Sequence, residues 1–562
     1  MILITPTTNG GNMNRIAHRA KDLRRRRLSW AVALAGAVVL CVTGGAFADK
    51  DRVPNRNGEK NDAGVMRTFT TAGFVDRTNP FFQPVGSTPR TCEHCHFASD
   101  AFSLSAEHAR NLFDKSHGTH PLFLPDAANN PVAAQALPPN ASRAQLRAAY
   151  SLMLEKGLAV SKVPLRLPTD NPRAEFRLVG VVDPSIPDLP TTTLPNGDTV
   201  GKPDAYFALT GTDPATGDPR LWLHRRPLPT TNFKFLTAAL WDGRNTANPN
   251  PEDPPVGIPT LSGLLTVGFD AIVGRLAPDN KAADGHTFTV VEKNVLAQQF
   301  LDLEVTLFTA QAEAHGAGRL DARGALGGPE KLAGEPFYFG MNDVLEGDFK
   351  TLQPFDPEAF MIYRAWENDP NPHRASIARG EKLFNSLRLN ITGVGGLNNA
   401  SITLPISGPS HGATITGPAS IPNGACSSCH DLPNVGDHST RLPIDIGVVE
   451  PAPVALGQEA VSGLPVFTFH RIDPNTNQDL DWSNPSNTRR VTDPGRAART
   501  GKWAHIGEFK GPILRGLAAR APYFHNGMAD TLEDVVDFYN ERFQVGLTKQ
   551  EKTDLVAFLN SL

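Results

Sequence analysis

The chain is poor in cysteine and has no long apolar run. Only five of its 562 residues are cysteine, which excludes the dense disulfide framework of a small secreted domain. The apolar stretch at residues 31–42 has 12 residues, and a helix of that length is too short to span a bilayer. We therefore expect no membrane span in the mature chain, and the length favours more than one domain.

Basic residues are not in excess either. The whole chain has 54 Lys and Arg against 58 Asp and Glu. Residues 1–48 hold seven basic and one acidic residue, so the remainder has 47 basic and 57 acidic residues and a net charge of −10. Such a surface repels nucleic acid and anionic lipid, and it attracts a basic protein partner. We expect no nucleic acid partner.

The N-terminal segment has the features of a secretory leader in their usual order. Four arginines at residues 24–27 precede the apolar stretch, and residues 46–48 read Ala-Phe-Ala, a small-x-small cleavage signal. We predict a signal peptide at residues 1–48. An uncleaved N-terminal anchor is the alternative.

The spacing Cys-x-x-Cys-His occurs twice, ending at His96 and at His430. This spacing is typical of covalent attachment of a c-type haem, with the histidine as the axial ligand of the iron. A zinc or redox site would not need a histidine directly after each pair. The attaching cysteines are Cys92, Cys95, Cys426 and Cys429. The fifth, Cys41, lies in the expected leader. Because covalent haem attachment takes place outside the cytoplasm, motifs and leader together predict a periplasmic protein.

Apolar spacing and turn residues predict the organisation of the chain. We expect a mainly α fold with two cytochrome c-type haem domains, residues 49–372 and 373–562, joined by long loops. The first would contain a large irregular, β-containing insertion, with a strand near residues 175–182. Helical spacing predicts one helix at residues 291–315. Capping signals at Thr531 and Thr548 predict two more near the C-terminus.

Two further stretches resemble the bacterial dihaem cytochrome c peroxidase superfamily, which includes the methylamine dehydrogenase maturation enzyme. The longer stretch covers residues 511–540 and contains Arg-Ala-Pro-Tyr-Phe-His-Asn-Gly at 520–527. The shorter is Leu-Trp-Asp-Gly-Arg at 240–244. The region 97–375 is much longer than in the compact peroxidases. The resemblance implies a peroxidase-like oxidoreductase with two covalently attached haem c groups.

The resemblance also implies roles for single residues. Trp241 would lie between the two haems as an electron relay. Tyr539 follows His525 by 14 positions, where the peroxidases carry a methionine and the maturation enzyme a tyrosine as sixth ligand of the C-terminal haem. We therefore expect Tyr539 to ligate the second iron, together with His430. Met528 and His438 are the alternative ligands.

Further contacts to the haems are implied by the same resemblance. His525 is expected at the edge of the C-terminal haem, and Arg515 beside a propionate. Calcium lies between the domains of relatives, but no cluster of candidate ligands stands out in this sequence. Calcium is therefore implied by the resemblance only.

The distal side of the first haem departs from the pattern of the family. Peroxidases that need reductive activation have a histidine there. In this chain His224 directly precedes two arginines and is expected to be displaced, while His117 and His120 lie in a polar stretch. We therefore expect an open position on the iron ligated by His96, as peroxide chemistry requires.

The family places a glutamate and a glutamine over that open position. On the helix expected at 291–315, our candidates for catalysis are Gln299 and Glu304, with Gln298 and Gln311 as alternatives. A positioned acid–base group contributes about 10²- to 10⁴-fold to rate.

Three functions agree with these patterns. The first is reduction of hydrogen peroxide with electrons from a small c-type cytochrome or a copper protein. The second is electron transfer by a dihaem cytochrome without peroxide chemistry. The third is a dihaem oxygenase that acts on an organic substrate held by the enlarged middle region. We rank them in this order.

Overall fold

Strands occupy a large share of the protein, whose structure is a computed structural model. It describes residues 51–55, 57–167, 174–214, 216–244, 261–403, 413–440 and 442–562. The expected signal peptide lies outside these residues. Of the described residues, 32% are helical and 20% are in strands, which form six sheets. The expected mainly α class is therefore wrong. Short segments rich in β-branched and aromatic residues pair across long sequence distances, and local spacing does not reveal such pairing.

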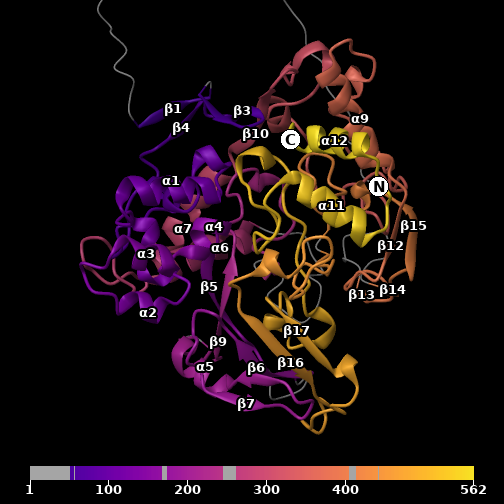
Figure 1. The fold of residues 1–562 in the computed structure, drawn as a ribbon. Helices are drawn as coiled ribbons and strands as arrows, with labels where there is room; N and C mark the ends of the chain where they lie inside the picture. Colours follow the sequence, from indigo (N-terminus) through magenta and orange to yellow (C-terminus); the bar gives the residue numbers. More distant parts are fainter. Residues whose placement is uncertain are drawn as a thin grey trace, which may run out of the picture. The chain divides into compact units, whose positions relative to one another are not determined.

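The elements follow one another as Figure 1 shows. The helices are α1 (Ala106–Ser116), α2 (Pro131–Gln135), α3 (Arg143–Ala149), α4 (Ser151–Lys156), α5 (Pro203–Thr210), α6 (Leu261–Ala271), α7 (Val290–Glu304), α8 (Pro329–Ala333), α9 (Pro372–Ser386), α10 (Ala497–Thr500), α11 (Leu532–Arg542) and α12 (Lys549–Leu559). The strands are β1 (Arg52–Pro54), β2 (Gly58–Asn61), β3 (Gly64–Thr70), β4 (Phe74–Asp76), β5 (Ala159–Pro164), β6 (Phe176–Val182), β7 (Thr191–Thr193), β8 (Thr199–Gly201), β9 (Arg220–Arg225), β10 (Leu307–Ala314), β11 (Gly318–Arg319), β12 (Leu389–Thr392), β13 (Ser401–Thr403), β14 (Thr414–Thr416), β15 (Ser420–Gly424), β16 (Val466–Arg471) and β17 (Thr488–Val491).

The largest sheet has the strand order β17-β16-β6-β8-β7. Antiparallel pairing of β16 with β6 sets Phe467 opposite Val181. Gly180 of β6 leaves room for a neighbouring side chain, because a Cβ there would lie 2.3 Å from a methyl carbon of Val200. The strands β16 and β17 follow residue 373 and the other three precede it, so this sheet joins the two expected haem domains. The expected strand near 175–182 is confirmed.

A second sheet, of order β11-β10-β3-β2, forms where a helix was expected. The helix predicted at residues 291–315 ends at Glu304, and β10 begins at Leu307. The part after Glu304 was therefore wrongly predicted. It pairs with β3 instead, and Phe308 lies opposite Phe69. The other sheets have two strands each and pair β1 with β4, β5 with β9, β12 with β15 and β13 with β14.

The C-terminal helices form as their capping signals predict. Thr531 accepts from the backbone N–H of Asp534 at the start of α11, and Thr548 accepts from that of Glu551 at the start of α12. Helix α12 packs closely on α9 (Figure 1), and a Cβ at Gly380 would lie 1.9 Å from a carbonyl of α12. Among the described residues, no helix has the length and apolar character needed to cross a bilayer.

Candidate haem-binding sites

Each Cys-x-x-Cys-His motif folds as a short 3₁₀ turn. The first turn spans Cys92–His94 and the second spans Cys426–Ser428. In both, the backbone N–H of the histidine bonds the carbonyl of the first cysteine, at 3.0 Å from His96 and 3.0 Å from His430. This tight local fold places both thiols and the imidazole of the second motif beside one cavity, and Cys95 and His96 of the first motif beside another.

Both histidines have the hydrogen bonding of an axial ligand. The Nδ1 of His96 lies 3.0 Å from the carbonyl oxygen of Phe102, and the Nδ1 of His430 lies 2.7 Å from that of Gly436. When Nδ1–H donates to a carbonyl, Nε2 is left with a lone pair for a metal. Burial lowers the pKa of each imidazole to about 4, so both rings are neutral near pH 7.

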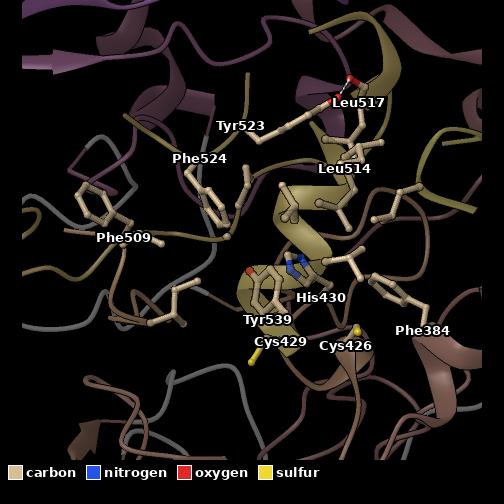
Figure 2. Close-up of a pocket in the computed structure, with 18 of the residues that line it drawn as sticks. Phe384, Cys426, Cys429, His430, Phe509, Leu514, Leu517, Tyr523, Phe524 and Tyr539 are labelled. Atoms are coloured by element: carbon tan, nitrogen blue, oxygen red, sulfur yellow. Dashed lines mark hydrogen bonds between the residues drawn. The ribbon is translucent and has the colours of Figure 1, made fainter. Parts of the chain in front are cut away.

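The second motif opens into a large apolar cavity (Figure 2). Cys426, Cys429, His430, Phe384 and Tyr539 line it. Its lining is made mostly of aliphatic and aromatic side chains from α9, α11, α12 and the loops between residues 425 and 530. An apolar cavity next to two thiols fits a porphyrin.

Polar atoms left without partners support the same fit. His525 lines the second cavity and is 2% exposed, yet neither of its ring nitrogens has a hydrogen-bond partner. Buried polar groups are rarely left unsatisfied in folded proteins. The expected place of His525 at the edge of the second haem agrees with this geometry.

The three candidate sixth ligands of the second haem differ in position. Tyr539 on α11 and His438 both line the cavity, whereas Met528 does not. Burial, followed by the neighbouring cysteines, raises the pKa of the Tyr539 phenol. The Nδ1 of His438 lies 3.4 Å from an Asp431 carboxylate oxygen. Both Tyr539 and His438 therefore stay candidates, and the sequence resemblance keeps Tyr539 as the expected ligand.

The first motif borders a second, more cationic cavity. Cys95 and His96 line it, together with Arg244, Asp270 and Arg275. Asp270, on α6, is the one carboxylate among the described lining residues, and His96 is the one histidine. Sequence reasoning did not find Asp270. Asp270 is separated from the Trp-Asp-Gly-Arg motif by the Pro-rich stretch near residue 250. No residue pattern in the sequence therefore linked it to that motif.

Trp241 stands in the wall that the two cavities share. It lines both, as do Arg226, Pro227 and Lys510. The indole N–H donates to the Arg226 carbonyl at 2.8 Å, which holds the ring in place. The ring centroid lies 6.1 Å from that of His525. The role of Trp241 as a relay between two haems stays a prediction.

The two polar residues expected over the first iron do not line either cavity. Gln299 is exposed on α7, where its carbonyl accepts from Asn79. Glu304 is buried at the end of α7, and desolvation raises its pKa to about 8. Burial, followed by the Glu304 carboxylate, raises the pKa of Cys92, so Glu304 lies near the first motif. The alternatives are also elsewhere, since Gln298 bonds Asp302 and Gln311 bonds Asn61.

Arg515 and His224 do not line either cavity. Arg515 donates from Nε to the Asn434 carbonyl at 2.7 Å and is absent from the cavity lining, while Arg520 belongs to it. The Nε2 of His224 lies 3.2 Å from the Asn129 carbonyl, away from both cavities. Among the described residues, no group of three or more His, Cys, Asp or Glu is arranged to hold a metal ion. Calcium stays a prediction.

Comparisons with known proteins give partial matches. No protein-family model matches the chain. It is 36% identical over 152 residues to cytochrome-c peroxidase IdrP2 of Denitromonas iodatirespirans, which covers 25% of this chain and 36% of that protein. It is 30% identical over 221 residues to cytochrome-c peroxidase IdrP2 of Pseudomonas sp. (strain SCT), which covers 37% and 53%. The chain thus spans about half or less of these curated relatives. Over part of its length, it is related to cytochrome-c peroxidases.

Proposed function

We propose that the protein is a periplasmic dihaem c-type cytochrome that reduces hydrogen peroxide with electrons from an external donor. The observation that carries this proposal is the pair of cavities, each bordered by one attachment motif and both bordered by Trp241. The partial similarity to cytochrome-c peroxidases supports peroxide as the substrate. When attached, haem would supply the iron that binds peroxide and exchanges electrons.

The first cavity is the proposed site of peroxide reduction. Besides His96, no His, Met or Tyr among the described residues lines it, so this lining offers an iron no second imidazole, thioether or phenol. Asp270 offers a carboxylate oxygen that can take a proton from peroxide and return it to the departing oxygen.

We propose that the second cavity and the shared wall transfer electrons from the donor to the first site. Tyr539 would ligate the second iron as a phenolate, a hard ligand that favours oxidised iron. Trp241 would pass electrons between the two sites, because its indole forms part of both cavity walls. The donor would be a small basic cytochrome or a copper protein, since the mature chain would carry a net charge of −10.

Stoichiometric peroxide titration of the oxidised, haem-loaded protein tests this proposal. We expect a rapid change in the Soret and near-infrared absorption that two electrons from a reduced donor reverse. An Asp270→Asn variant should react about 10²- to 10⁴-fold more slowly, while Asp302→Asn, which changes an exposed carboxylate on α7, should react normally. If the protein reacts only after half-reduction, the first site has a sixth ligand. Protein that is inert in both states would be an electron carrier.

A further inference from the structure

Two buried arginines of the second cavity have no carboxylate partner. Arg226 is 5% exposed and Arg520 is 8% exposed. The Arg226 guanidinium donates to the carbonyls of Pro522 and Leu104. That of Arg520 donates to the Ile513 carbonyl, and its Nε has no partner. Neither forms an ion pair with any carboxylate of the described residues, and both line the cavity.

Burial disfavours the charged form of both arginines. Burial and, to a smaller extent, the charge of Arg520 lower the pKa of Arg226 to about 9. Burial also lowers the pKa of Arg520 to about 10. A third cation, Lys510, lines the same wall, but its Nζ lies 3.6 Å from an Asp437 carboxylate oxygen. Buried charges are retained when they are paired, so two guanidinium groups without a carboxylate partner suit a ligand that brings negative charge into the cavity.

We propose that Arg226 and Arg520 bind the two propionate groups of the haem attached at Cys426 and Cys429. Guanidinium groups suit carboxylates because they offer parallel N–H donors. A porphyrin carries two propionates on the edge opposite its two vinyl groups. This inference rests on the haem-attachment part of the proposed function and on no part of its peroxide chemistry.

The ends of the cavity agree with that orientation. Figure 2 shows Cys426 and Cys429 at one end and Tyr523 and Leu517 at the other. Arg520 lies between these last two in sequence, and Arg226 bonds the carbonyl of Pro522, the residue before Tyr523. The cysteines would therefore hold the vinyl edge, and the arginines the propionate edge. Arg226 also lines the first cavity, so the propionate edge would face the wall that contains Trp241.

The contrast with Arg515 makes the inference specific. Arg515 is also buried, at 3% exposed, it bonds the Asn434 carbonyl and its Nη1 has no partner, but unlike Arg520 it does not line the cavity. Arg515 and Arg520 lie five positions apart in the same segment, which follows Lys510 of the shared wall. Arg515→Gln is therefore a matched control for Arg520→Gln, since each removes one buried guanidinium from the same segment.

The test uses the haem-loaded full chain and two readouts other than turnover. Resonance Raman spectra report the propionate bending bands, and spectroelectrochemical titration reports the midpoint potential of the His430 haem. We expect Arg520→Gln and Arg226→Gln to shift the bands. Each should also disfavour reduction by about tenfold, which is about 59 mV for a one-electron couple, because loss of a cation favours the more positive iron. Arg520→Lys should retain most of the potential, and Arg515→Gln should leave the bands unchanged.

Each result decides between outcomes. Bands that shift in Arg515→Gln but not in Arg520→Gln would overturn the proposal, as would bands unchanged in both Arg226→Gln and Arg520→Gln. If Arg226→Gln does not fold, as judged by circular dichroism, the Arg520 pair of variants still decides. Haem content, measured by the pyridine haemochrome assay, distinguishes failure of the proposed dihaem function from failure of the propionate assignment. Fewer than two haems in the wild-type chain would overturn the dihaem function itself, whereas two haems with unchanged bands would overturn only the propionate assignment.

Discussion

Replacing Glu304 by glutamine should change how stability depends on pH. Glu304 ends α7, is 8% exposed, and burial raises the pKa of its carboxyl from 4.5 to about 8. The folded protein therefore holds this proton more tightly than the unfolded chain does. The buried carboxyl costs little below pH 4.5, and it destabilises the fold increasingly as the pH rises toward 8. Glutamine has no proton to lose and removes this dependence.

The size of the effect follows from the pKa. One pKa unit is about 1.36 kcal/mol, so the full difference between 4.5 and about 8 is about 5 kcal/mol. Between pH 5 and pH 9, the wild-type free energy of unfolding should fall by about 4 kcal/mol more than that of Glu304→Gln. That is a large fraction of the usual 5–15 kcal/mol for a folded domain.

Urea unfolding of the haem-loaded protein, followed by far-ultraviolet circular dichroism across that pH range, measures this difference. Glu541→Gln is the matched control, because Glu541 is exposed on α11 and its variant should follow the wild-type profile. Parallel pH profiles of Glu304→Gln and the wild type would refute the reasoning. They would mean that the Glu304 carboxyl is solvated or paired in the folded protein.

Three further predictions concern the two cavities and the wall between them. Arg225 bonds Asp242 at 2.7 Å and Asp493 at 2.7 Å, and all three side chains are buried. Arg225→Met should therefore lower the free energy of unfolding by about 3–5 kcal/mol. A loss below about 1 kcal/mol in urea unfolding would contradict the pairing. Trp241→Phe should slow donor-supported peroxide turnover without changing haem content, and turnover at the wild-type rate would make Trp241 structural. Tyr539→Phe should change the absorption spectrum of the second haem at neutral pH, and an unchanged spectrum would leave His438 as the candidate ligand.

The candidate sites divide into what adjacent residues encode and what distant segments assemble. The two Cys-x-x-Cys-His motifs predict haem attachment because five consecutive residues carry the whole chemistry, and each motif folds locally as a 3₁₀ turn. The relay position of Trp241 also agrees with its local motif. Gln299 shows the limit, because helical spacing could not tell an exposed face of α7 from a cavity wall.

Fold class shows the same division. The helices α11 and α12 carry their own capping boxes and were predictable from four residues each. The strands β6 and β16 are nearly 300 residues apart and pair only in the folded chain, so the mainly α expectation was wrong.

By itself, the sequence determined where the two final helices begin, because their capping depends on contacts within a few residues. It also predicts where haem attaches and which imidazoles ligate the iron, because each of these predictions depends on five consecutive residues. The tertiary structure alone decided that Asp270 borders the first cavity. It also decided that Arg226 and Arg520, almost 300 positions apart, share one wall of the second. Burial and unpaired charge are properties of the whole packed fold, and no local pattern of residues specifies them.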